Sequence, residues 1–243
     1  MKLLVDIGNT RVRWAVFREG VIGGVRSSRH EECASAWSGL PVENALYCSV
    51  APAARCELVL AALANIPCRR VMARQRCGGV INGYERPERL GDDRWAALLA
   101  ARSVEPERHV IIADAGTAVT LDSMDCSGRH HGGAILAGPA AQRSGLAALA
   151  PGLPAVGGKP GLPARGTSDA LASGAWIGLA GGIEHVANAL TDPQADSAFL
   201  LTGGDAAALR PWLSQRWRHD PLLTLRGLLI AEEHECAGSP SSS

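Results

Sequence analysis

Hydrophobic and polar residues alternate at the start of the chain in a pattern that predicts short, half-buried strands. The first half of the chain is expected to contain, in order, strands at 2–6, 11–17 and 21–26, a polar helix at 30–38, a buried strand at 45–50, a helix at 52–64, a strand at 70–72, and a helix at 95–104. A long loop rich in Gly, Arg and Pro is expected at 74–90. Such loops are uncommon in compact domains unless they bind something.

The second half begins in the same way, with apolar runs that again predict strands before helices. Its expected elements are strands at 109–114, 117–123 and 130–136, helices at 139–149 and 169–190 with Ser168 as N-cap, a strand at 199–202, and helices at 206–215 and 225–235. In both halves antiparallel strands come first and β-α units follow. This order predicts an α/β fold of mixed sheets flanked by helices. We expect one half at 1–105, a second at 106–236 and a disordered tail at 237–243.

Two segments carry nearly the same sequence at the end of a hydrophobic strand. Asp6-Ile7-Gly8-Asn9-Thr10 and Asp114-Ala115-Gly116-Thr117 both read Asp-x-Gly followed by a hydroxyl within two residues. A single copy is typical of an ordinary turn. The two copies are 114 − 6 = 108 positions apart, which indicates two related half-domains that face one ligand across a cleft. Glycine N–H groups suit phosphates, and a carboxylate at a strand tip suits the phosphates' metal ion.

Composition narrows the classes of function. The 243 residues include 24 Lys and Arg and 24 Asp and Glu, so no strong field favours a nucleic-acid partner. No apolar run reaches membrane-spanning length and no signal-peptide pattern opens the chain, so a cytoplasmic enzyme without a membrane partner is expected. Seven cysteines without a Cys-x-x-Cys pair argue against a disulfide framework or a zinc site. The His130-His131 pair is expected on a hairpin surface.

Two common nucleotide-binding signatures are missing. The chain has no Gly-x-x-x-x-Gly-Lys-Ser/Thr, which disfavours a P-loop kinase. It also has no Gly-x-Gly-x-x-Gly, which disfavours a Rossmann enzyme and a protein kinase.

Five motifs together resemble the type III pantothenate kinases over nearly the whole chain, from Lys2 to about Glu235. These motifs are Asp6-x-Gly8-Asn9-Thr10, Gly91-x-Asp93-Arg94, Asp114-x-Gly116-Thr117-Ala118, Gly132-Gly133-x-Ile135 and Thr202-Gly203-Gly204-Asp205-Ala206. The resemblance implies duplicated actin-like (ribonuclease H-like) domains with the active-site cleft between the halves. It also implies ATP-dependent phosphorylation of pantothenate to 4'-phosphopantothenate, the first step of coenzyme A biosynthesis.

The resemblance also assigns roles to single residues. Asp93 matches the catalytic base. The alternative is that a carboxylate here only places negative charge at the first turn of the helix that follows, and this interpretation is favoured for Asp92. The expected substrate-binding residues are Tyr84, Gly91, Asp92, Asp93, Arg94 and Thr167. The expected ATP-binding and phosphate-binding residues are Asp6, Ile7, Gly8, Asn9, Thr10, Arg11, Val12, Arg13, Gly116, Thr117, Gly203 and Gly204.

Cations and a partner subunit are implied as well. Asp6 is expected to position Mg²⁺, usually through water, because this ion keeps much of its hydration shell. Asp114 matches a ligand of a monovalent cation, K⁺ or NH₄⁺. The resemblance further implies a homodimer whose substrate site lies near the subunit interface.

The chain departs from the family pattern at two places. Arg13 stands where many relatives have Lys, which keeps the charge in a different shape. The segment Leu136-Ala137-Gly138-Pro139 has Gly before Pro, in the reverse of the usual order.

Two alternatives remain open at this point. The duplicated turns define ATP handling and leave the acceptor undefined, so another small-molecule kinase of the superfamily fits them too. A non-catalytic ATP-sensing regulatory protein is the second alternative, against which the intact Asp6, Asp93 and Asp114 speak.

Overall fold

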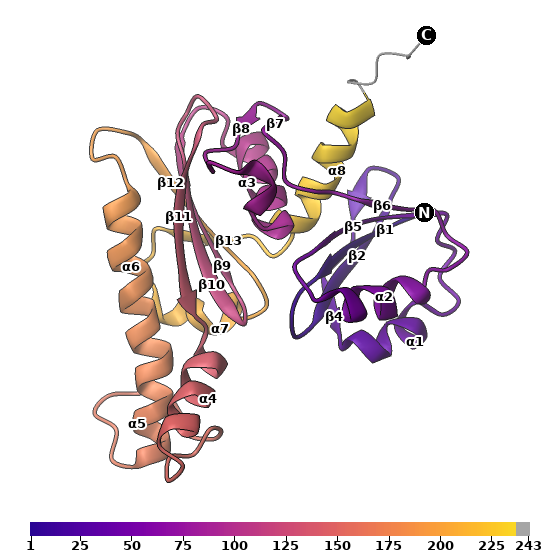
Figure 1. The fold of residues 1–243 in the computed structure, drawn as a ribbon. Helices are drawn as coiled ribbons and strands as arrows, with labels where there is room; N and C mark the ends of the chain where they lie inside the picture. Colours follow the sequence, from indigo (N-terminus) through magenta and orange to yellow (C-terminus); the bar gives the residue numbers. More distant parts are fainter. Residues whose placement is uncertain (237–243) are drawn as a thin grey trace. The chain divides into compact units, whose positions relative to one another are not determined.

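The computed structural model describes residues 1–236 and divides the chain into two compact units (Figure 1). Among the described residues, the first unit comprises 1–107, 124–131 and 221–236, and the second comprises 108–123 and 132–220. The tail expected at 237–243 lies outside the described residues.

A mixed sheet forms the centre of the first unit. Its strands are β1 (Lys2–Ile7), β2 (Val12–Arg18), β3 (Val21–Ile22), β4 (Arg26–Ser28), β5 (Asn44–Ser49) and β6 (Cys68–Arg70). The order is β3-β2-β1-β5-β6, with β4 paired to β2. Strand β1 runs antiparallel to β2 and parallel to β5, so the sheet is mixed, as the sequence predicts.

Helices cover both faces of this sheet. They are α1 (Cys33–Trp37), α2 (Ala53–Ala61), α3 (Asp92–Val104) and α8 (Leu223–Cys236). Leu3, Val5 and Ile7 pack in one apolar cluster with residues of α1 and α2, whereas α3 contacts β5, and α8 contacts β1 and β5. Because side chains alternate along a strand, Leu4 and Asp6 lie on the other face, toward α3 and α8.

Helices α3 and α8 pack closely against each other. A Cβ atom on Gly227 would lie 1.8 Å from the Ala96 carbonyl oxygen, so only glycine permits this approach of the two backbones.

The second unit is built on another mixed sheet. Its strands are β9 (His109–Ala115), β10 (Ala118–Met124), β11 (His130–Ala137), β12 (Ser197–Thr202) and β13 (Trp217–His219), in the order β11-β10-β9-β12-β13. Strand β12 runs parallel to β9 and to β13. Helices α4 (Pro139–Leu149), α5 (Thr167–Ser173), α6 (Leu179–Leu190) and α7 (Ala206–Leu209) complete the unit, with a π-helical turn at Gly174–Gly178 between α5 and α6.

The structure corrects several expected boundaries. The N-cap of α5 is Gly166, so the prediction of Ser168 was wrong. Helix α7 ends at Leu209, and the following residues form a short 3-10 turn and then the unforeseen strand β13. The strand expected at 70–72 lies two residues earlier, at β6. The loop at 74–90 contains a small hairpin, β7 (Arg76–Cys77) and β8 (Val80–Ile81).

Candidate active site

Asp6 lies at the penultimate position of β1 and is only 7% exposed. The Cys48 thiol, its register partner on β5, donates a hydrogen bond to Asp6 Oδ1 over 3.6 Å. On the opposite neighbour, β2, Arg13 places Nη1 3.8 Å from Asp6 Oδ2. Arg13 is itself fixed by a 2.7 Å bond from Nη2 to the Pro221 carbonyl oxygen. The carboxylate is thus held between a thiol donor and a guanidinium.

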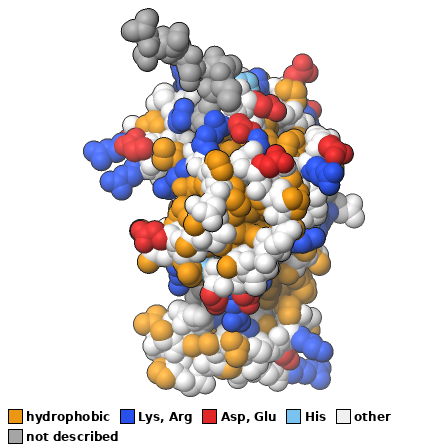
Figure 2. All heavy atoms as spheres, turned by 90° about the vertical axis from the view of Figure 1, so that its right-hand side faces the viewer, with side chains coloured by type: hydrophobic (Ala, Val, Ile, Leu, Met, Phe, Trp, Pro, Cys, Tyr) orange, Lys and Arg blue, Asp and Glu red, His pale blue; other side chains and the backbone are white. Residues whose placement is uncertain are grey.

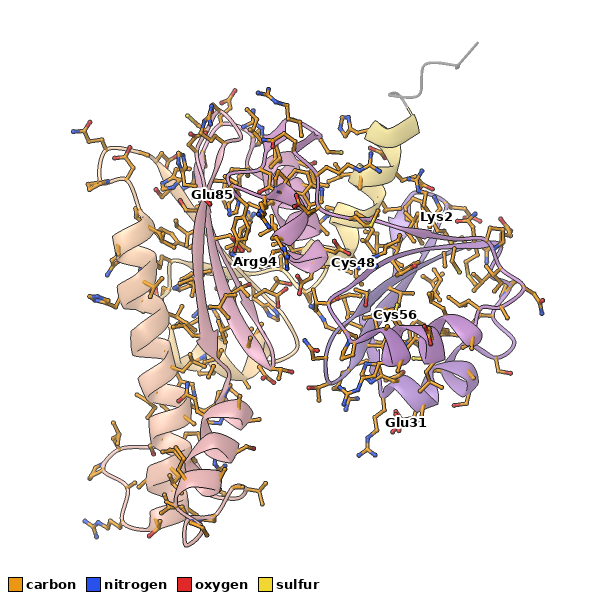
Figure 3. All side chains as sticks on the ribbon, viewed as in Figure 1. Lys2, Glu31, Cys48, Cys56, Glu85 and Arg94 are labelled. Carbon is orange, nitrogen blue, oxygen red and sulfur yellow. The ribbon has the colours of Figure 1, made fainter. Side chains whose placement is uncertain are left out.

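Burial raises the pKa of the Cys48 thiol well above its ordinary value, and the carboxylates of Asp6, Asp93 and Asp92 raise it further. The thiol therefore stays protonated and available as a donor. The electrostatic effect of all three carboxylates on one sulfur also indicates that β1 and the start of α3 bring their acidic groups close to Cys48 on β5. Figure 3 shows Cys48 on β5 and Arg94 on α3.

The turn after β1 is closed by its own backbone and supported by basic side chains. Gly8 N–H donates to the Arg11 carbonyl oxygen over 3.1 Å. Arg11 Nε donates to Ser27 Oγ over 2.7 Å, and Arg55 donates to the Asn9 carbonyl oxygen. Asn9, Thr10 and Arg11 are exposed, whereas Ile7 and Val12 are buried and anchor the turn. An exposed turn with arginine side chains nearby suits an anionic ligand.

Helix α3 begins at the segment that the sequence singles out. Gly91 is its N-cap, and a Cβ atom there would lie 2.6 Å from Asp93 Oδ1, so the glycine makes room for this carboxylate. Asp93 is half-buried, and its Oδ1 accepts a 2.7 Å hydrogen bond from the Arg94 backbone N–H.

Asp92 has a different environment from its neighbour. Its Oδ2 accepts from Arg70 Nε at 3.0 Å and lies 2.9 Å from Arg70 Nη2, while its Oδ1 accepts from the Ala73 N–H at 3.1 Å. These contacts tie the start of α3 to the last residue of β6 and to the segment just after it, and they favour a structural role for this carboxylate.

Tyr84 and Arg94 are brought together from the loop and the helix. Arg94 Nη1 donates a 2.7 Å hydrogen bond to the Tyr84 hydroxyl, and its guanidinium carbon lies 5.4 Å from the centre of the Tyr84 ring. Arg94 is 5% exposed and Tyr84 is half-buried. The imidazole of His130 stacks on the Tyr84 ring at 5.8 Å between centroids and 16° between planes.

His130 corrects an expectation from the sequence. It is 1% exposed, so the prediction that it lies on the hairpin surface was wrong, whereas its neighbour His131 is exposed. Burial of His130 comes from contact with the distant loop and leaves no trace in the local sequence.

In the second unit, Asp114 lies one residue before the end of β9 and is half-buried. Its register partner on β12 is Thr202, whose buried Oγ1 has no hydrogen-bond partner among the described residues. Gly116 N–H donates to the Ala118 carbonyl oxygen over 3.0 Å and closes the turn. Thr117 is exposed.

Two further glycines press against this turn. A Cβ atom on Gly138 would lie 2.1 Å from the Gly116 carbonyl oxygen, and one on Gly203 would lie 2.2 Å from that of Ala115. Gly138 is the N-cap of α4 with Pro139 at its first position, which is a favourable place for proline. Gly203 has φ +103° and is buried, while Gly204 is exposed.

Thr167 is the first residue of α5 and is exposed. Asp169 Oδ1 in the same turn accepts a hydrogen bond from the Lys159 N–H over 2.9 Å.

Sequence reasoning missed four side chains that support these groups: Cys48, Arg70, His130 and Thr202. Each contacts or neighbours a predicted residue only through strand pairing or packing, so spacing along the chain could not reveal it. The first Asp-x-Gly motif gave one indirect signal for Cys48. Asp6 lies near the end of a buried strand, so a neighbouring parallel strand had to place some side chain opposite its carboxylate.

No group of three or more His, Cys, Asp or Glu side chains that could hold a metal ion occurs in the described part of the chain. Within the same residues, every helix is too short or too polar to cross a membrane. On the face drawn in Figure 2, basic and acidic side chains are interspersed, consistent with equal numbers of both in the sequence.

Comparisons with known proteins agree with the motifs. The family model for type III pantothenate kinase matches residues 2–189. A type III pantothenate kinase of Chromobacterium violaceum is 39% identical over 94% of this chain and 98% of its own length, and one of Halorhodospira halophila is 36% identical over 97% and 99%.

Solved structures share the fold at low identity. A Campylobacter jejuni structure, named for the Baf family of transcriptional activators, has a TM-score of 0.60 at 22% identity and covers 95% of this chain and 98% of its own. Component A of the (R)-2-hydroxyglutaryl-CoA dehydratase of Acidaminococcus fermentans has a TM-score of 0.51 at 13% identity, with 97% and 98% covered.

Proposed function

We propose that Asp93 is the catalytic base of this chain, which belongs to the type III pantothenate kinase family. The chain has the duplicated actin-like fold and phosphorylates pantothenate with ATP in coenzyme A biosynthesis. The observation that supports this role is the contrast within one turn of helix. Asp92 is held by Arg70 and Ala73, whereas Asp93 is half-buried beside Arg94, which reaches Tyr84. A carboxylate of this kind orients the attacking hydroxyl and accepts its proton late in a loose transition state.

Pantothenate binding falls to the residues around Arg94. A guanidinium offers directional hydrogen bonds to the carboxylate or amide oxygens of pantothenate. The Tyr84 hydroxyl and the turn from Gly91 to Arg94 complete the proposed set, with Asp92 acting through the position of that turn. Thr167 belongs to the set on the resemblance alone.

The turn after β1, from Asp6 to Arg13, is proposed to bind the phosphates of ATP. Arg13 supplies positive charge next to Asp6, and the exposed turn residues offer backbone N–H groups. In the second unit, Gly116, Thr117, Gly203 and Gly204 are the proposed ATP contacts. The close packing of Gly203 on Ala115 gives that segment a fixed shape.

The donor set around Asp6 fits Mg²⁺ held through water, because a single carboxylate is enough for an ion that keeps most of its water ligands. Bound there with ATP, the ion would supply positive charge that screens the phosphate oxygens. Asp6 is kept in place for this role by Cys48 and Arg13.

Asp114 is the proposed ligand of a monovalent cation, K⁺ or NH₄⁺. The oxygen-rich surroundings fit such an ion, since the Thr202 hydroxyl on the paired strand is buried and has no partner within the described chain. An ion at this place would add fixed positive charge next to the transferring phosphate.

A homodimer is proposed for the assembly. Large apolar side chains are exposed on β11, on α4 and on the segment that follows α4, namely Ile135 at 65%, Leu149 at 88%, Val156 at 79% and Leu162 at 72%. Large apolar side chains left exposed in this number are a feature of protein interfaces. The mass in solution tests this, and a monomer at micromolar concentration would contradict it.

The decisive experiment is the substitution Asp93→Asn, assayed with Mg-ATP and pantothenate by formation of phosphopantothenate. Turnover is expected to fall by about two to four orders of magnitude, the scale of a positioned base, while the thermal midpoint stays at the wild-type value. Asp92→Asn is the matched control and is expected to act mainly on the thermal midpoint. Near-normal turnover of the Asp93 variant would remove Asp93 from the base role.

The cation is tested in the same assay by replacing K⁺ with Na⁺. The wild type is expected to lose most of its activity in Na⁺, and Asp114→Asn is expected to respond equally weakly to both ions. A variant that keeps the full preference for K⁺ would contradict the assignment of Asp114.

A further inference from the structure

His130 stands outside the residues that the family motifs single out, yet its imidazole stacks on the ring of Tyr84. The two rings are nearly parallel, at 16°, with centroids 5.8 Å apart. His130 is the first residue of β11 and is almost completely buried. A buried flat ring next to a half-buried one restricts how the second can turn.

The backbones beneath the two rings are joined as well. Ile81 N–H donates to the Gly128 carbonyl oxygen over 2.9 Å, and Ile81 pairs with Arg129 in a parallel bridge. A Cβ atom on Gly83 would lie 1.8 Å from the His130 carbonyl oxygen, so the Gly83 backbone rests directly on His130. The loop and the start of β11 therefore form one connected piece.

Asn82 fixes the loop from the other side. It is 3% exposed, and its side-chain amide donates to the Pro87 carbonyl oxygen over 3.1 Å. Its Oδ1 accepts the Tyr84 N–H over 3.0 Å. The Tyr84 backbone is thus set by Asn82, and its ring is contacted by His130 and by Arg94.

From these contacts we propose that His130 is a positioning residue for pantothenate binding. Its imidazole holds the Tyr84 ring, and through the 2.7 Å bond from Arg94 to the Tyr84 hydroxyl it also holds the guanidinium. Removing the imidazole frees the Tyr84 ring and, with it, the guanidinium that binds the substrate. This inference rests on the proposed function, in which Tyr84 and Arg94 bind pantothenate.

The test compares three substitutions of His130 in the full-length enzyme by steady-state kinetics. His130→Ala and His130→Leu are expected to raise the KM for pantothenate by about three- to tenfold, the scale of an aromatic stacking contact. His130→Phe keeps a flat ring and is expected to stay within about twofold of the wild type. The KM for ATP is expected to stay unchanged in all three.

His131→Ala is the matched control, because this neighbouring histidine is exposed and is assigned no role in the site. It is expected to leave both KM values unchanged. If His130→Ala does not fold, the comparison of His130→Leu with His130→Phe decides, since the two side chains are both apolar and only one is aromatic.

The outcomes separate this inference from the proposed function through a parallel Tyr84→Ala variant. If Tyr84→Ala raises the pantothenate KM and His130→Leu does not, the positioning role is overturned and the proposed site stands. Equal pantothenate KM values for the Leu and Phe variants also overturn the positioning role. They are the result expected if His130 only stabilises the fold, since its loss would then lower the thermal midpoint and leave the KM for pantothenate unchanged. If Tyr84→Ala leaves the pantothenate KM unchanged, the proposed binding role of Tyr84 fails and the inference fails with it.

Discussion

The turns after β1 and β9 carry the same sequence signature and are built in different ways. In the first, Asp6 lies next to the guanidinium of Arg13, and Arg11 and Arg55 support the turn through bonds to Ser27 and Asn9. Gly8 meets only the Arg11 carbonyl oxygen, 3.0 Å from where a Cβ would be. Side chains, mostly basic, therefore shape the first turn.

The second turn is shaped by backbone packing. Gly138 and Gly203 approach its carbonyl oxygens so closely that any side chain would collide with them. The partner of Asp114 on the adjacent strand is the hydroxyl-bearing Thr202. A duplicated motif has thus acquired a cationic environment in one copy and an oxygen-rich, tightly packed environment in the other, which matches the proposed division into phosphate and cation binding.

Among the substitutions that test this division, Asp6→Asn is expected to have the largest effect, a fall in kcat. The change keeps the shape of the side chain and removes the charge that faces Arg13 and would hold the waters of Mg²⁺. We expect kcat to fall by about 10²- to 10³-fold, as when one preorganised electrostatic group is lost. The measurement is kcat at saturating Mg-ATP and pantothenate, and Glu19→Gln, an exposed carboxylate in the next turn, serves as control. A fall of less than tenfold would mean that the first turn does not depend on its carboxylate.

An intermediate effect is expected from adding a methyl group within the first turn, at Gly8, or against the second turn, at Gly203. Gly203→Ala places a Cβ 2.2 Å from backbone at φ +103°, and strain of this kind costs about 1–3 kcal/mol. For a chain of this size the thermal midpoint should fall by several degrees, at roughly 2–4 °C per kcal/mol. Gly8→Ala meets only one oxygen, at 3.0 Å, and is expected to lower the midpoint much less. Equal losses in the two variants would remove the structural contrast between the turns.

Much of the fold could be predicted because its strongest signals are local. Strands β1 and β9 are buried along almost their whole length, and such apolar runs between turn residues are easily recognised. The mixed character of both sheets followed from the order of strands and helices. Strand β13 could not be predicted in this way, because three residues are too few for a period. It exists because Trp217 pairs with Phe199 on β12 and packs in the core of the second unit.

The supporting side chains of the site were harder to predict than its acidic residues. Asp93 and Arg94 stand in a motif, whereas His130 lies 130 − 84 = 46 positions from the ring on which it stacks. Likewise, Cys48 meets Asp6 only through the register of β1 and β5. Such contacts depend on which strands pair and in which register, and these are properties of the folded chain.

The smallest expected effect concerns Asp205, which lies at the start of α7 and donates its N–H to the Ala115 carbonyl oxygen over 2.9 Å. Burial raises the pKa of its carboxyl above the ordinary value. A carboxyl whose pKa is higher in the folded state stabilises the fold at pH values below its unfolded pKa. This contribution is lost as the pH rises through the folded pKa. At neutral pH the charged Asp205 therefore costs stability that Asn would not.

Asp205→Asn is accordingly expected to raise the thermal midpoint at pH 7 slightly. Because the group is partly exposed and solvent screens its charge, the gain is expected to be less than about 1 kcal/mol. Asn serves as well as Asp at a helix N-cap, so the substitution leaves the start of α7 intact. The gain should shrink toward zero as the pH is lowered below the ordinary pKa of Asp, which a series of melting curves would reveal. If the gain in thermal midpoint of Asp205→Asn does not vary with pH, the surroundings of the second turn tolerate negative charge as readily as water does. The electrostatic difference between this turn and the arginine-supported first turn would then be contradicted.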